Sequence, residues 1–96
     1  MSVRVTLNCQ VKADQFELLY PFLEINLPNV RGFQGNRRVS VLYDTNSDEM
    51  LLDEEWLSVE SHQAYLQHIA ENGVLAKLAE FLLSPPQIKY FEQLDV

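Results

Sequence analysis

The sequence predicts an α+β domain whose elements follow the order strand, helix, strand, strand, helix, strand. Three observations predict it: four segments alternate apolar and polar residues, two longer segments have helical spacing, and turn-forming residues lie between them. This order is the split βαβ arrangement of a ferredoxin-like sandwich with a four-stranded antiparallel sheet. At 96 residues the chain has room for one core, so we expect residues 1–96 to form a single domain.

The first half of the chain is predicted to begin with a strand and a helix. Strict alternation from Val3 to Val11 predicts the strand. Asp14, with Glu17 three residues later, is placed to cap the helix that follows. We expect Pro21 to kink this helix and Pro28 to end it, because proline lacks the backbone N–H that a helix interior needs.

The remaining elements follow from the same patterns. We predict strands over 39–43, 50–57 and 87–94, a hairpin loop over 44–49, and a helix from Ser58 to about Asn72. Gly73 suits the end of that helix, and helical spacing continues for a short distance after it. The strand that ends near Trp56, the only tryptophan, therefore passes directly into the second helix.

Composition and charge exclude several classes of protein. The chain carries 7 Lys and Arg against 14 Asp and Glu, a net charge of -7, so we expect no nucleic-acid partner. Nothing in the sequence indicates a membrane protein, and the N-terminus has no signal or transit pattern, so we expect a cytoplasmic protein. The single cysteine, Cys9, cannot form an internal disulfide and is expected to be a small buried residue.

No motif for a bound cofactor or metal is present. The three glycines, Gly32, Gly35 and Gly73, form neither a dinucleotide-binding fingerprint nor a P-loop. His62 and His68 lie six residues apart, with no nearby third ligand, so we expect no metal site. The sequence also lacks the elbow motif of serine hydrolases.

The third predicted strand carries one carboxylate among apolar neighbours. Met50, Leu52, Glu54 and Trp56 share one face of it. Glu54 is either exposed at an edge or lies under the helices, where desolvation would raise its pKa and suit it to acid–base chemistry. Trp56 either fills the core or forms the wall of a pocket.

The second predicted helix carries a histidine on its apolar face. His62 falls within an arc of roughly 80° with Val59, Leu66 and Ile69, and Tyr65 lies beside them. His62 and Tyr65 are therefore expected to point inward, either as hydrogen-bonded core residues or as groups that handle protons.

The sheet has a second face that the helices leave uncovered. Asn8 on the first strand faces either a pocket under the helices or this uncovered side. Because apolar residues occur on both faces of the third and fourth strands, we expect a second copy of the chain to pack there.

Three segments support a resemblance to a known family: residues 53–58, 64–68 and 82–91. Over Val3 to Leu94 the chain resembles the antibiotic biosynthesis monooxygenase (ABM) domain family of the dimeric α+β barrel superfamily. That superfamily also contains quinol monooxygenases and haem-degrading monooxygenases. The resemblance implies a homodimer that pairs two sandwiches into one barrel.

The resemblance also implies a cofactor-independent monooxygenase, an oxidoreductase that oxidises a small phenolic or quinol-type aromatic with dioxygen. Family members place an Asn and a Trp in the pocket, so it implies that Asn8 hydrogen bonds a substrate oxygen and Trp56 forms the ring wall. Tyr65, His62 and Glu54 are then candidates for proton handling.

The sequence departs from the family at one position. Haem-degrading relatives carry a His nine or ten residues after the Trp, where this chain has Tyr65 and Leu66, so haem binding is not expected. The alternative to an enzyme is a non-catalytic dimeric barrel that binds a small ligand or a protein partner. A cavity shared by Asn8, Trp56 and the proton-handling residues favours the enzyme, and a packed Trp56 with Asn8 on the opposite face favours the binding protein.

Overall fold

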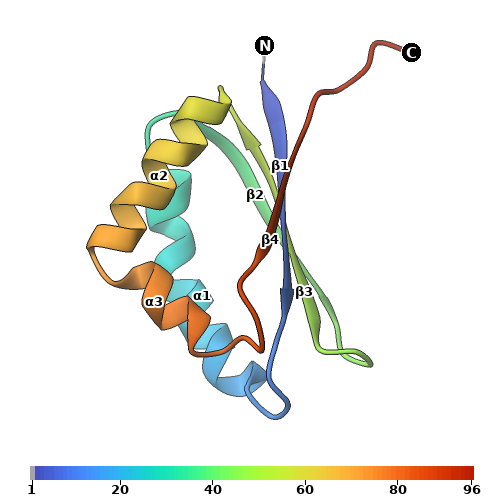
Figure 1. Cartoon of the computed structure of the whole chain (residues 1–96), viewed down its shortest axis with the longest axis vertical. Helices are drawn as coiled ribbons and strands as arrows, with labels where there is room; N and C mark the ends of the chain where they lie inside the picture. Colours follow the sequence, from blue (N-terminus) through green and yellow to red (C-terminus); the bar gives the residue numbers. More distant parts are fainter. Residues whose placement is uncertain (1) are drawn as a thin grey trace.

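The computed structural model describes residues 2–96 and has two layers, a four-stranded antiparallel sheet and three helices on one of its faces (Figure 1). The elements are β1 (Val3–Gln10), α1 (Phe16–Arg31), β2 (Asn36–Asp44), β3 (Glu49–Trp56), α2 (Val59–Glu71), α3 (Val74–Ala79) and β4 (Gln87–Phe91). The strand order is β2-β3-β1-β4, which confirms the predicted ferredoxin-like sandwich. Within residues 2–96, no helix has the length and apolar character needed to cross a membrane.

The core lies between the sheet and the helices. In β1 and β3 buried and partly exposed residues alternate strictly, because successive side chains of a strand point to opposite faces. The odd-numbered residues of β1 and the even-numbered residues of β3 point towards the helices and are buried. Antiparallel pairing of β1 with β3 places Val5 opposite Glu54 and Leu7 opposite Leu52. Glu54 is therefore held on the buried side by the register of the two central strands.

Helix α1 differs from its predicted form at both ends. Asp14 adopts a left-handed backbone conformation (φ 62°) in the turn before the helix, so the cap position falls on Gln15, whose side chain makes no capping hydrogen bond. The helix also continues through Pro21 and Pro28 to Arg31. Both prolines are exposed, so the carbonyl groups that lose their N–H partners can hydrogen bond to water.

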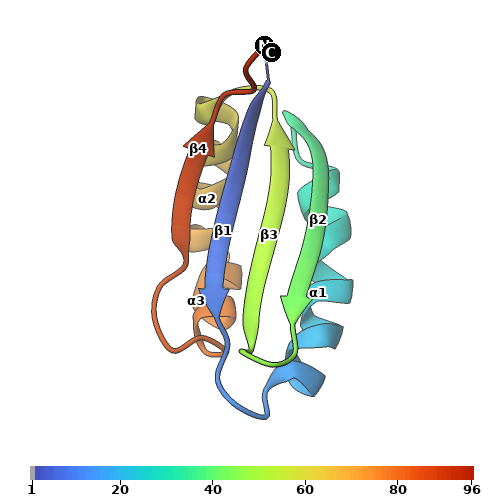
Figure 2. The same cartoon turned by 90° about the vertical axis from the view of Figure 1, so that its right-hand side faces the viewer.

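Helix α2 and the segment after it match the prediction. The Ser58 side chain accepts a hydrogen bond from the Ser61 N–H and caps the helix. Gly73, at φ 88°, ends it and is followed by the short helix α3. Helices α2 and α3 lie behind β4 and β1 when the open face of the sheet is viewed, and α1 lies behind β2 and extends past its outer edge (Figure 2).

The face of the sheet that the helices leave open is largely polar. Asp53 pairs with Arg4 and Arg38, at 3.1 and 3.2 Å between nitrogen and oxygen. Between these charges Leu42 and Phe91 remain about half exposed, at 54% and 49%. The open face thus has exposed apolar residues that a partner could bury, and charged residues that are already paired with each other.

We predict that Gly35→Ala lowers the free energy of unfolding by about 2–4 kcal/mol, because a left-handed backbone and a steric clash act together there. Gly35 has φ +93°, and an added Cβ would lie 2.6 Å from Ser61 Cβ on α2. Gly73→Ala is the matched control, with φ +88° but open space around the added Cβ, and should cost about 1–2 kcal/mol. Urea unfolding of both variants measures this, and equal losses would contradict the clash.

Candidate functional site

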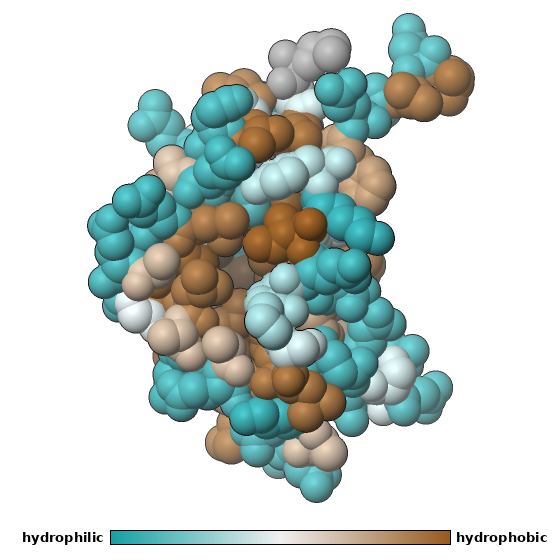
Figure 3. Space-filling view, viewed as in Figure 1, coloured by the Kyte–Doolittle hydropathy of each residue, from teal (hydrophilic) through white to brown (hydrophobic). Residues whose placement is uncertain are grey.

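A cavity of about 250 Å³ lies between the sheet and all three helices. Leu7 and Leu52 form its floor, and apolar residues of the helices and the Pro85–Pro86 segment form most of its wall. The space-filling view shows an apolar hollow between the helices and β4 (Figure 3). Only a few polar side chains reach this cavity: Asn26, Glu54, His62 and Tyr65.

Glu54 is the buried carboxyl of the cavity, with 3% of its surface exposed. The sequence left open whether it lies at an exposed edge, and the strand register excludes that alternative. Burial raises the pKa of Glu54, the neighbouring Asp53 carboxylate adds to the rise, and a hydrogen bond from the Trp56 indole acts against it. That hydrogen bond joins Trp56 Nε1 to Glu54 Oε1 at 2.7 Å.

His62 lies beside Glu54 and is 1% exposed. Its Nδ1 atom lies 2.8 Å from the hydroxyl oxygen of Tyr90, and its Nε2 atom lies 3.9 Å from Glu54 Oε1. The second distance is too long for a hydrogen bond, so the carboxyl does little to stabilise an imidazolium. Burial therefore lowers the pKa of His62 to about 4, and the ring is neutral at neutral pH.

Tyr65 lies one turn further along α2 and also reaches the cavity. Its ring packs against Phe33 and Trp56, with ring centroids 5.2 and 5.4 Å away. Burial, and to a lesser degree the Glu54 charge, raises the pKa of Tyr65 to about 12. Its hydroxyl is therefore a hydrogen-bond donor and not a base near neutral pH.

Trp56 is fully buried and supports the cavity from behind its wall. Its ring packs against His62, with ring centroids 5.3 Å apart, and its N–H fixes the carboxyl of Glu54. The sequence left open whether Trp56 fills the core or forms a pocket wall. The structure places it in the core, where it holds two of the cavity residues in position.

The structure does not bring Asn8 into this group. Asn8 lies on the open face of the sheet, pairs with Leu51 in the β1–β3 register, and donates a hydrogen bond to Glu49 Oε2 at 2.6 Å. The resemblance implied that Asn8 and Trp56 share one pocket, and the structure places them on opposite faces of the sheet. Even-numbered residues of β1 face away from the helices, and Trp56 pairs with Val3 at the other end of the strand.

Two residues of the site were missed from the sequence. Tyr90 on β4 is opposite Val5, and so on the helix side of the sheet, where its hydroxyl meets His62. The alternation of Ile88 and Tyr90 was a signal for this face, but the register of an edge strand is not readable from alternation alone. Asn26 of α1 lines the cavity wall, and its amide donates to the Phe22 carbonyl at 2.8 Å.

The remaining reactive side chains do not add a metal site or a nucleophile. Among residues 2–96, no cluster of three His, Cys, Asp or Glu side chains is placed to hold a metal ion. Cys9 is fully buried, and burial raises the pKa of its thiol to about 11, so it is protonated near neutral pH.

The fold occurs in solved structures. The chain superimposes on Rv0793 from Mycobacterium tuberculosis with a TM-score of 0.83 and 19% identity, over 100% of this chain and 98% of that one. It also matches a protein from Nitrosomonas europaea, provisionally named an antibiotic biosynthesis monooxygenase, with a TM-score of 0.84, 16% identity, and coverage of 98% and 91%. A third match, named an antibiotic biosynthesis monooxygenase, has a TM-score of 0.83, 9% identity, and coverage of 96% and 98%.

These likenesses extend over nearly the whole chain in each case. No protein-family model matches the sequence, and no curated protein sequence matches it. At identities below 25%, the comparisons establish that this chain has the fold of the proteins named antibiotic biosynthesis monooxygenases.

Glu54 and His62 are expected to make opposite contributions to the pH dependence of stability. The native state binds fewer protons than the unfolded state at His62 between pH 4 and 6.5, so this residue makes stability rise with pH, by up to about 1.4 kcal/mol per unit. At Glu54 the native state binds more protons above pH 4.5, so stability falls with rising pH.

Urea unfolding from pH 4.5 to 6.5 separates the two contributions. Glu54→Gln should make stability rise more steeply with pH than in the wild type, and His62→Gln should make it rise less steeply or fall. Identical slopes in all three proteins would show that neither group has a shifted pKa.

Proposed function

We propose that this protein is a cofactor-independent monooxygenase of the antibiotic biosynthesis monooxygenase family that oxidises a small phenolic or quinol-type aromatic with dioxygen. One observation carries the proposal: the apolar cavity contains a neutral imidazole and a carboxyl of raised pKa, both fixed by hydrogen bonds from outside the cavity. Desolvated acid–base groups in an apolar cavity are typical of catalytic sites. The names of structures with the same fold support the same reaction class.

The size of the cavity fits this substrate class. Its volume of about 250 Å³ is below the range of roughly 300–1,000 Å³ that holds drug-sized ligands. A planar aromatic of one or two rings is therefore the expected ligand. The apolar floor of Leu7 and Leu52 would contact the ring, and the hydroxyl of the substrate would lie towards His62.

In the proposed reaction, the substrate supplies the electrons and His62 accepts the proton. When His62 donates its Nδ1–H to Tyr90, the Nε2 lone pair is free to take the phenolic proton. The resulting phenolate reduces dioxygen and forms a carbon–oxygen bond at a hydrogen-bearing ring carbon ortho or para to the hydroxyl. Loss of the hydrogen on that carbon as a proton, together with cleavage of the O–O bond, then gives a quinone and water. One phenol and one dioxygen are consumed for each quinone and water released.

Glu54 and Tyr65 would complete the proton transfers. The raised pKa of Glu54 favours its protonated form, which can give one proton to the distal peroxide oxygen. The His62 imidazolium gives the second proton, so this oxygen leaves as water, and the proton lost from the ring carbon restores the Glu54 carboxyl. The Tyr65 hydroxyl remains protonated and can donate a hydrogen bond to the phenolate or the peroxide. Trp56 would act as a positioning residue, since it holds the Glu54 carboxyl and does not line the cavity.

The second candidate function is a non-catalytic protein that binds a small apolar ligand in the same cavity. Two observations favour it: Trp56 is packed in the core, and Asn8 lies on the opposite face of the sheet. This candidate predicts ligand binding without oxygen consumption, so the two functions are separated by one assay.

We propose further that the protein is a homodimer formed through the open face of the sheet. The half-exposed Leu42 and Phe91 on that face support it, since a second copy would remove both from water.

Oxygen uptake with a panel of phenols and hydroquinones of one and two rings tests the enzyme, with three-ring anthrones as substrates expected to be too large for the cavity. His62→Gln should lower kcat/KM by about 10²–10⁴-fold, the usual contribution of a general base, with Glu54→Gln lower by a similar factor. His68→Gln is the matched control, since His68 is an exposed histidine of the same helix, and it should retain full activity.

Two outcomes would contradict the enzyme. One is uptake that is equal in wild type, His62→Gln and Glu54→Gln. The other is no uptake with any substrate although aromatic ligands bind in the cavity, which would favour the binding protein.

Light scattering tests the dimer. We expect a mass of twice the 11.1 kDa of one chain at micromolar concentration, and Leu42→Glu should reduce it to that of one chain because it places a charge in the proposed interface. A wild-type protein that is monomeric under these conditions would refute the proposal.

A further inference from the structure

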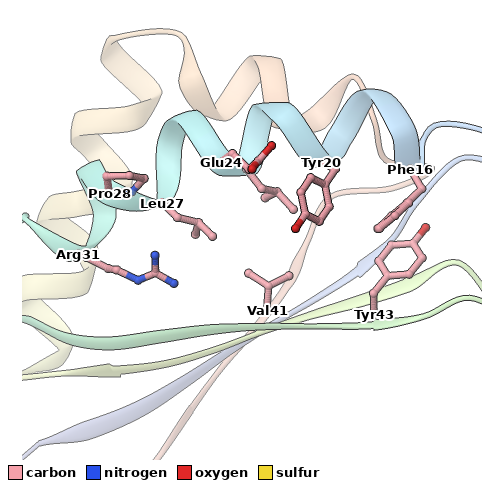
Figure 4. Close-up of a pocket in the computed structure, with 9 residues that line it drawn as sticks. Phe16, Tyr20, Glu24, Leu27, Pro28, Arg31, Val41 and Tyr43 are labelled. Carbon is pink, nitrogen blue, oxygen red and sulfur yellow. The ribbon is translucent and has the colours of Figure 1, made fainter.

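A second, larger hollow lies outside the Glu54 cavity, between α1 and the edge strand β2 (Figure 4). We call it the α1–β2 groove, and its volume is about 510 Å³. Its wall includes the aromatic residues Phe16, Tyr20 and Tyr43, the aliphatic residues Leu27 and Val41, the acidic residue Glu24 and, at the opposite end from the aromatic rings, Arg31.

The groove is open because the sheet ends at β2. No strand flanks the outer side of β2, and Val41, which faces α1, is only partly buried. On the helix side of the groove Tyr20 is 53% exposed. Phe16 packs against Tyr43, with ring centroids 4.5 Å apart, and closes one end with aromatic surface. The result is an elongated apolar surface in contact with water.

The other end of the groove carries a positive charge, Arg31, that makes no ion pair among residues 2–96. Arg31 extends its guanidinium into the groove and donates one hydrogen bond, to the Val39 carbonyl at 3.3 Å. Among residues 2–96, no Asp or Glu oxygen lies within 4.0 Å of it. Glu24 also lines the groove, from the α1 side between Tyr20 and Leu27, but makes no ion pair with Arg31 (Figure 4). In a chain of net charge -7, an arginine without an acidic partner at the end of an apolar groove is complementary to an anion.

We propose that the α1–β2 groove binds an amphipathic carboxylate of the medium-chain fatty acid class. The carboxylate would pair with the free N–H groups of Arg31, and the tail would lie over Leu27 and Val41 towards the aromatic end. From Arg31 to Tyr20 the helix rises about 16 Å, which is longer than an extended ten-carbon chain, so such a tail fits between the two ends of the groove.

The groove is distinct from the proposed catalytic cavity. Leu23 and Leu27 line both and form the partition between them. The Glu54 cavity is a poor alternative site for this ligand, because it contains no Lys or Arg that could pair with the carboxylate. Binding in the groove therefore does not depend on whether the cavity is catalytic.

Titration of the ¹⁵N-labelled protein with sodium decanoate tests the proposal, with decanol as the uncharged ligand of equal length. Decanoate should shift backbone amide signals of α1 and β2 and bind at least tenfold more tightly than decanol. Arg31→Gln should weaken decanoate binding about tenfold and leave decanol binding unchanged. Arg37→Gln is the matched control, since Arg37 is an exposed arginine of β2 outside the groove, and it should bind as the wild type does.

Three results would overturn the proposal. The first is no saturable binding of decanoate. The second is equal affinity of decanoate for the wild type and Arg31→Gln, in a variant whose amide spectrum shows the native fold. The third is a set of shifts centred on Leu66 and Leu75, which line the Glu54 cavity and not the groove.

Discussion

The hydrogen bond from the Trp56 indole to Glu54 is the interaction on which the account of the site depends. It joins two buried residues of the same strand face and fixes a carboxyl where the sheet and α2 meet. A buried carboxyl without a donor would be strongly destabilising, so the indole N–H makes its position possible. The orientation of His62 follows from the same packing, because its ring lies against Trp56 and its Nδ1 meets Tyr90.

The helices and strands that position these side chains explain how a domain of this size can contain a reactive site. The central strands β1 and β3 fix Glu54 and Trp56, helix α2 fixes His62 and Tyr65, and the edge strand β4 adds Tyr90. Each titratable side chain of the site is therefore placed by a helix or a strand and not by a loop. That arrangement keeps the geometry of the site rigid, which acid–base chemistry requires.

Much of the fold could be predicted because its signals are local. Alternation in β1 and β3, the Ser58 cap and the Gly73 stop each act over a few residues. The inward direction of His62 followed from helical periodicity in the same way. Pro21 and Pro28 misled the prediction of α1, because a proline on the exposed side of a helix is tolerated by solvent.

The site was less predictable because it depends on the register between strands. The resemblance implied that Asn8 shares a pocket with Trp56. Asn8 lies instead on the open face, because it is an even-numbered residue of β1 and these side chains point away from the helices. Tyr90 was missed since its contact with His62 joins residues 28 positions apart across an edge strand. The burial of Glu54 could not be predicted either, because alternation shows which residues share a face of the strand but not which other elements cover that face.

The most direct test of the account is the ionisation of Glu54 and His62 in the folded protein, measured by NMR titration of ¹³C-labelled carboxyl and imidazole carbons. We expect the Glu54 carboxyl to titrate with a midpoint above pH 4.5 and the His62 ring with a midpoint near pH 4, so that both groups are neutral over a shared range of pH. A Glu54 midpoint at or below 4.5, together with a His62 midpoint at or above 6.5, would show an ion pair in place of two neutral groups and would contradict the account.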